Sequence, residues 1–352
     1  MSWSRSIRDF RVKWTRWEFW PAWFFNIPVL FIALYYGLRS GNLLFFTRAN
    51  PVIETGGLLG ESKINIYRHL PADVYPATIF IPAGQRQPDG IRRQLLTARI
   101  GWPCIAKPNM GERGFLVHKC ANETALLEHL IAHPEIDFLV QDFVTWEEEY
   151  SVMYHRFPDA EQGQITSLCA KGFLSVTGDG QRTVRELMTD DPRASFQLDR
   201  LSLEQPELLR SRPGAGERVL LEPIGNHCRG TTFLNANDRI TPALTSRFDE
   251  ISHASTGLYY GRFDLKCRSL ADLEKGQHFA IMEYNGVGAE PAHIYHPGRS
   301  LWKAYRDMAA HWDILYRLCR EQKKRGVPAE TIRQVWQQIQ VWRNQQPLRA
   351  RE

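Results

Sequence analysis

The sequence lacks the patterns that mark several large classes of protein. Its six cysteines form no Cys-Xaa-Xaa-Cys pair, so nothing indicates a zinc ribbon or a redox motif. The net charge of +5 over 352 residues is moderate, and no nucleic-acid-binding motif is present. No Gly-Xaa-Xaa-Xaa-Xaa-Gly-Lys-Ser/Thr occurs, which excludes a Walker-type phosphate loop. We therefore expect a protein of a reducing, cytosolic compartment that binds no nucleic acid.

A long apolar run near the N-terminus follows a basic, tryptophan-rich stretch. Residues 19 to 38 contain no charged residue, and a helix of this length could cross a bilayer. Pro21, Asn26 and Pro28 are expected to interrupt a helix here. Residues 14–38 therefore predict a peripheral or re-entrant membrane contact, and the alternative is a first helix packed on the protein's own core or on a second subunit. No small-residue cleavage site follows, so we do not expect a secretory signal peptide.

The pattern after residue 300 changes to a helical period. Apolar side chains recur at helical spacing from Leu301 to Leu318, and Gly326-Val327-Pro328 then ends the pattern. A second helix is expected from about residue 329 to 342. We expect both helices to pack on the protein, with their aromatic face over a sheet or a partner.

Two segments in the last third alternate as strands do and carry acids. Residues 258–266 include Arg262 and Asp264, and residues 279–285 include Glu283 and Asn285. Side chains two apart share a sheet face, so a hairpin would bring the four together. Their oxygens are the ligands that Mg²⁺ prefers, and phosphates would complete the shell. A cross-strand salt-bridge ladder around the arginine is the alternative.

A short apolar strand upstream ends in a lysine and enters a glycine loop. Lys107 closes the stretch from Trp102, and Gly111 and Gly114 follow it. Backbone N–H groups of such a loop can bind phosphates while the lysine adds a charge. An apolar strand at 138–144 and a second strand from Glu149 come next.

These motifs, in this order, resemble the ATP-grasp ligases over roughly residues 55 to 300. The metal hairpin is most similar to D-alanine–D-alanine ligases, and residues 176–187 are similar to cyanophycin synthetase. The resemblance implies an α+β fold in which two subdomains grip ATP between two mainly antiparallel sheets. Here an N-terminal aromatic helical segment (residues 1–54) would precede the ATP-grasp domain (55–300, with subdomains of about 65–144 and 145–300), and a C-terminal helical pair (301–352) would follow it.

The resemblance also implies a role for each matching residue. Asp264, Glu283 and Asn285 would hold Mg²⁺, Arg262 would stabilise the transferred phosphoryl group, and Lys171 would reach the γ-phosphate. The nucleotide would be held by the two phosphate lysines, the glycine loop, a hinge that binds adenine and an acid on the ribose: Lys63, Lys107, Gly111, Gly114, Gln141, Asp142, Phe143, Val144 and Glu149. Candidate substrate contacts are Asn226, Arg229, Glu290, His293 and Tyr295.

The expected reaction joins a small-molecule carboxylate to an amine or thiol, with ATP and Mg²⁺ as cofactors. A kinase and a catalytically silent nucleotide-binding scaffold are the alternatives. Lys63 comes too early for the N-terminal substrate domain of D-alanine ligases, which argues against D-alanine as substrate, and a partner could supply that domain. An ATP-dependent site must face the cytoplasm, so we expect the protein in the cytoplasm, associated with the inner face of the membrane. Relatives are often dimers, and the sequence leaves the oligomeric state open.

Overall fold

Two antiparallel sheets organise the chain in the computed structural model, which describes residues 3–111, 114–223 and 225–345. The smaller sheet has the strand order β1-β4-β2-β3. One face of it packs against α4 and α5 around a core that includes Ile91, Leu126 and Phe138. Its elements are β1 (Thr78–Ile81), α4 (Pro88–Ala98), β2 (Cys104–Pro108), β3 (His118–Cys120), α5 (Glu123–Ala132) and β4 (Phe138–Asp142).

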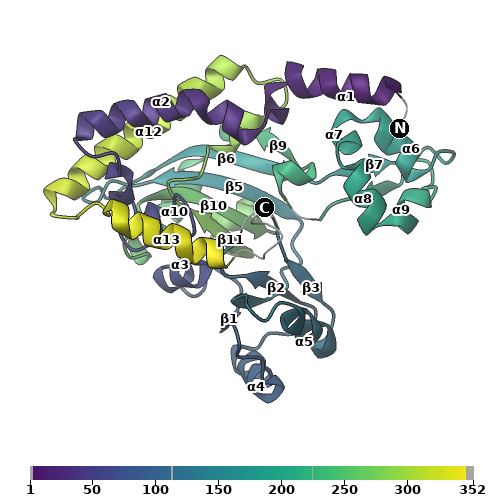
Figure 1. Cartoon of the computed structure of the whole chain (residues 1–352), viewed down its shortest axis with the longest axis horizontal. Helices are drawn as coiled ribbons and strands as arrows, with labels where there is room; N and C mark the ends of the chain where they lie inside the picture. The colour runs from purple at the N-terminus through teal and green to yellow at the C-terminus, as the bar shows by residue number, and fades with distance from the viewer. Residues whose placement is uncertain (1–2, 112–113, 224, 346–352) are drawn as a thin grey trace.

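The larger sheet has the order β11-β10-β5-β6-β9, and it lies above the smaller one in Figure 1. Alternate side chains of its strands, such as Val152, Phe263 and Leu265, point into one core with α10. The opposite face carries the polar residues of the hairpin. Its elements are α3 (Lys63–His69), β5 (Glu148–His155), β6 (Gln164–Gly172), β9 (Thr232–Asn235), η5 (Asn237–Arg239), α10 (Pro242–Ala254), β10 (Tyr260–Cys267), α11 (Leu270–Glu274) and β11 (Phe279–Asn285).

A third unit is inserted between β6 and β9, and Figure 1 shows it to one side of the sheets. It has its own small core, to which Val184, Leu198 and Leu209 belong. A capping box at Thr183 begins its first helix. The elements are β7 (Ser175–Thr177), α6 (Val184–Asp190), α7 (Pro192–Ser195), α8 (Leu198–Glu204), α9 (Pro206–Arg210), β8 (Arg218–Leu220) and η4 (His227–Arg229).

The N-terminal segment contains a long apolar helix, α2, which begins after Pro21 and continues through Pro28. Pro21 is the residue before the first turn of α2, where its missing N–H costs nothing, and Pro28 lies inside the helix. The expected interruption is correct at Pro21, which lies between η1 and α2. It is wrong at Asn26 and Pro28, because packing of α2 on α12 offsets the one hydrogen bond that Pro28 removes. The elements are α1 (Trp3–Thr15), η1 (Trp17–Phe19), α2 (Ala22–Ser40), η2 (Phe45–Arg48) and η3 (Glu54–Gly56).

The two C-terminal helices differ in how they pack. α12 (Leu301–Lys324) buries a face that includes Met308, Leu315 and Leu318 against α2, η2 and η6 (Ala292–Tyr295). α13 (Ile332–Asn344) has no buried residue and touches η3. The expectation that both helices bury an aromatic face is correct for α12 and wrong for α13, whose Trp336 is exposed.

The prediction of an α+β fold with two mainly antiparallel sheets, an N-terminal apolar helix and a C-terminal helical pair is confirmed. The proposed division at residue 144 falls in the linker between β4 and β5. All six cysteines are free, and five of them are buried while Cys228 is exposed.

Candidate functional site

The predicted hairpin places its four polar side chains on one sheet face. β10 and β11 pair antiparallel, with Arg262 opposite Asn285 and Asp264 opposite Glu283. A bulge after Asp264 shifts the register, and the short helix α11 replaces the simple turn expected between the strands. Residues directly opposite each other point to the same face, so the four functional groups lie side by side.

Asp264 is the centre of a buried charge network. Arg262 donates from Nε to Oδ1 at 3.1 Å and from an NH2 group to Oδ2 at 3.2 Å, and Ser151 Oγ donates to Oδ1 at 2.5 Å. The Asn285 amide nitrogen lies 3.4 Å from Oδ2. Burial disfavours the carboxylate, but Arg262 and Lys171 outweigh it and lower the pKa of Asp264. Asp264 is therefore ionised at neutral pH.

Lys171 extends this network to the neighbouring strands. Its Nζ lies 2.7 Å from Glu149 Oε1 and 3.8 Å from Asp264 Oδ2. Burial would lower the pKa of Lys171, yet Asp264 and Glu149 together raise it. Sequence analysis missed Ser151, although it lies two residues after Glu149 on β5 and so shares its face.

The two predicted phosphate lysines face the hairpin from α3 and the smaller sheet. Lys107 Nζ donates to the Met282 carbonyl at 2.9 Å and to the Tyr67 hydroxyl at 3.1 Å. Lys63 Nζ donates to the Gly111 carbonyl at 2.7 Å and lies 3.3 Å from Glu283 Oε1. These contacts join the two sheets at the place where the four hairpin side chains lie.

Lys107 is 8% exposed and has no carboxylate among its hydrogen-bond partners. Burial lowers its pKa to about 7, the charge of Lys63 acts in the same direction, and Glu283 opposes it. A buried ammonium without a matched anion is what a phosphate would stabilise. Gly114 has a left-handed backbone, and Glu112 and Arg113 of the predicted loop lie outside the described residues.

The loop after β8 lies directly on the Lys171–Glu149 pair. A Cβ added to Gly225 would lie 2.3 Å from Glu149 Oε1, so a side chain there would collide with the pair. Asn226 caps the short helix η4 by accepting from the Cys228 N–H, and Arg229 lies 3.2 Å from the buried Glu222 carboxylate. The structure therefore brings the loop to the site, while the Arg229 side chain is held by Glu222.

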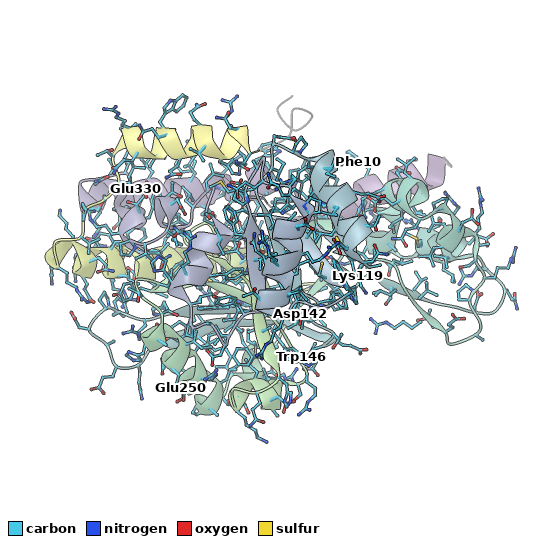
Figure 2. All side chains as sticks on the ribbon, turned by 90° about the horizontal axis from the view of Figure 1, so that it is seen from below. Phe10, Lys119, Asp142, Trp146, Glu250 and Glu330 are labelled. Carbon is cyan, nitrogen blue, oxygen red and sulfur yellow. The ribbon has the colours of Figure 1, made fainter. Side chains whose placement is uncertain are left out.

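The four residues of the predicted hinge are divided between a strand and a linker. Gln141 and Asp142 belong to β4, and the Asp142 N–H donates to the Ala77 carbonyl. Phe143 and Val144 begin the linker to β5. Lys119 Nζ lies 3.9 Å from the Phe143 ring centroid. Figure 2 labels Lys119 of β3 and Asp142 of β4, the strands on either side of β2.

The three residues predicted after the metal ligands have different surroundings. The Glu290 carbonyl accepts from Arg262 at 3.2 Å, and its carboxylate accepts from the Tyr295 hydroxyl and, at 3.1 Å, from Asn26 of α2. His293 is buried, with Nδ1 2.8 Å from Ser167 Oγ and Nε2 3.3 Å from Asp307. Glu290 and Tyr295 thus adjoin the site, while both His293 ring nitrogens are already bonded.

No protein-family model matches the chain, and no curated protein does. Among solved structures, a bifunctional glutathione synthetase from Pasteurella multocida matches with a TM-score of 0.39 and 14% identity, over 67% of this chain and 34% of its own. D-alanine–D-alanine ligase from Bacillus anthracis matches with a TM-score of 0.42 and 14% identity, over 81% of this chain and 71% of its own. Carboxyaminoimidazole ribonucleotide synthase from Aspergillus clavatus, complexed with ATP, matches with a TM-score of 0.37 and 10% identity, over 66% of this chain and 45% of its own.

The chain's resemblance to the ATP-grasp ligases rests on its own sequence motifs. Its two antiparallel sheets agree with the predicted ATP-grasp fold. The chain spans about a third of the length of the glutathione synthetase and less than half of the ribonucleotide synthase.

The donor set of this candidate site fits a magnesium ion in kind. Asp264, Glu283 and Asn285 offer hard oxygens from one sheet face. The described residues hold no cluster of three His, Cys, Asp or Glu side chains suited to a metal, and two acids with one amide are not such a cluster. In this structure Arg262 neutralises Asp264, and Lys63 neutralises Glu283.

Proposed function

We propose that this chain is an ATP-dependent ligase that activates a carboxylate as an acyl phosphate and joins it to an amine. One observation carries the proposal. Four cations, Lys63, Lys107, Lys171 and Arg262, converge on the hairpin from α3 and both sheets. Three of them lie within 4 Å of its acids, and Lys107 bonds to the Met282 carbonyl. A cluster of buried cations beside hard oxygen ligands suits a nucleoside triphosphate with its metal.

The lysines and the arginine would each act on a different part of the phosphoryl transfer. Lys63 and Lys107 would neutralise the phosphates nearest the smaller sheet, and Lys171 would reach the γ-phosphate. Arg262 would balance charge on the equatorial oxygens as the carboxylate oxygen attacks phosphorus and ADP leaves. Asp264, Glu283 and Asn285 would hold Mg²⁺, which neutralises charge on the phosphates. Glu149 would bind the ribose hydroxyls, and Phe143 and Val144 the adenine.

The amine would then attack the acyl carbon, and phosphate would leave. Water has to be kept out, since it would hydrolyse the acyl phosphate. The loop at Gly111 and Gly114 and the loop at Gly225 lie against Lys63 and Glu149, so they are the candidate covers. Arg262 bonds to the Glu290 carbonyl, which supports Glu290 and Tyr295 as substrate contacts.

The membrane face is the second part of the proposal. α2 is the one described helix long and apolar enough to cross a bilayer, with 17% of its most apolar window buried. Its inner side reaches the site through Asn26 and Glu290, while its outer side is apolar and exposed. Contact of this helix with the cytoplasmic membrane surface would keep the site beside the cytoplasmic ATP supply.

Trapping the acyl phosphate tests the proposal. Phosphate release from Mg·ATP is measured with a panel of carboxylates in the presence of hydroxylamine, for the natural protein, Arg262→Gln and Arg268→Gln. Arg268 follows the same strand and is exposed, so it is the matched control. We expect carboxylate-dependent hydroxamate that only Arg262→Gln abolishes. A phosphorylated product without hydroxamate would indicate a kinase, and no turnover of any carboxylate would favour a silent scaffold.

A further inference from the structure

A basic cavity lies apart from the nucleotide site, where α2 and α12 both end. It has a volume of about 180 Å³, far more than the ~10–15 Å³ that one water needs. Figure 1 shows α2 and α12 packed side by side, and η2 contacts α12. The lining residues are Arg39, Ser40, Phe45, Arg48, Tyr316, Cys319, Arg320 and Lys323.

The cavity has four cations and, among the described residues that line it, no acid. Arg39, Arg48, Arg320 and Lys323 form no ion pair with a described carboxylate. Cations near a helix C-terminus are common because they complement the helix dipole, and that accounts singly for Arg39, Arg48 and Lys323. It does not account for four like charges around one cavity, which repel each other unless an anion lies between them.

Two of these cations are held in place before any ligand binds. The Arg39 guanidinium lies 4.9 Å from the centroid of the Tyr316 ring, and Arg48 Nε donates to the Val327 carbonyl at 2.9 Å. The remaining N–H groups of each guanidinium stay available to an anion. A planar donor group fixed in this way loses little entropy when it binds phosphate oxygens.

We propose that this cavity binds a phosphate group. The ligand is either the head group of an anionic phospholipid or a small soluble phosphate, since both present the same oxygens. The exposed face of α2 leads to the cavity: Trp23, Ile27, Leu30, Phe31, Leu34, Tyr35 and Leu38 lie at helical spacing, and Arg39 follows at once. An apolar helix face with cations at its end is suited to the boundary between acyl chains and head groups.

Paired charge removals on one helix test the proposal. Arg320→Gln with Lys323→Gln removes two cavity cations, and Lys303→Gln with Lys324→Gln removes two charges from the same helix outside the lining. All four side chains are exposed, so both variants should fold. One arm measures sedimentation of the full chain with phosphatidylcholine vesicles with and without phosphatidylglycerol. The other measures inorganic phosphate binding by titration calorimetry.

The cavity variant should lose about 25-fold in affinity, at about fivefold for each of its two charges, and the matched variant far less. A loss confined to the phosphatidylglycerol vesicles identifies a lipid head group as the ligand. A loss with inorganic phosphate identifies a small phosphate, because the nucleotide site is intact in both variants. Equal effects of the two variants in both arms would overturn the proposal, since general charge attraction would then explain the binding.

Discussion

Replacing Asp264 with Asn should destabilise the protein as well as stop its turnover. Asn has nearly the same shape, but it removes the charge that Arg262 and Lys171 share and leaves an amide N–H₂ beside one of these donors. Removing one member of a buried ion pair costs about 3–5 kcal/mol, because the partner stays buried. We expect the lower end, about 3 kcal/mol, since Lys171 keeps Glu149 and Arg262 keeps the Glu290 carbonyl.

Urea unfolding of the natural protein and the variant measures this loss. With a slope of about 3 kcal/mol/M, a loss of about 3 kcal/mol lowers the midpoint by about 1 M. Asp159→Asn is the control, because Asp159 pairs with Arg325 but is 81% exposed. Its midpoint should not change measurably.

Added inorganic phosphate separates the charge network from a simple packing defect. The Asp264→Asn site carries one more uncompensated positive charge, so phosphate should raise the thermal midpoint of the variant more than that of the natural protein. A variant with an unchanged urea midpoint would refute the reasoning, because the network around Asp264 would then not be formed without ligand.

Three further predictions follow from single features of the structure. Because burial lowers the pKa of Lys107 to about 7, and phosphates would favour the ammonium, ATP binding should take up about half a proton at pH 7 and about 0.9 at pH 8, and affinity should fall as pH rises further. Calorimetry in buffers of different ionisation enthalpy measures this, and binding without proton uptake would contradict it. Leu30→Glu with Leu34→Glu, on the exposed face of α2, should release the folded protein from vesicles, and undiminished pelleting would count against the membrane contact. Cys228 should react with a maleimide in the folded protein while the five buried cysteines do not, and mass spectrometry that finds another labelled site first would contradict the described burial.

The hairpin could be predicted from sequence because its information is local. Alternation fixes which face Arg262 and Asp264 share, and the short connection through α11 brings Glu283 and Asn285 opposite them. The network beyond the hairpin could not be predicted in the same way. Lys171 meets Glu149 through the pairing of β5 with β6, and no local pattern specifies that register.

Other parts of the structure depend on contacts between distant segments. The helix α2 continues through Pro28 because it packs on α12, almost three hundred residues away. Asn26 reaches Glu290 for the same reason, and sequence periodicity gives no sign of it. The residue type alone is also a weak guide to the role of Arg229. Its guanidinium is expected to bind a substrate, but it pairs with the buried carboxylate of Glu222.

The transfer of oxygen from the carboxylate to phosphate tests the central claim most directly. The protein would be incubated with Mg·ATP, amines and a pool of carboxylates labelled with ¹⁸O, and the released phosphate analysed by mass spectrometry. A carboxylate that attacks the γ-phosphate leaves one of its oxygens on the phosphate when the amine displaces it. The account predicts phosphate that carries one ¹⁸O. Phosphate released with no label would contradict it, because the carboxylate would then never have been phosphorylated.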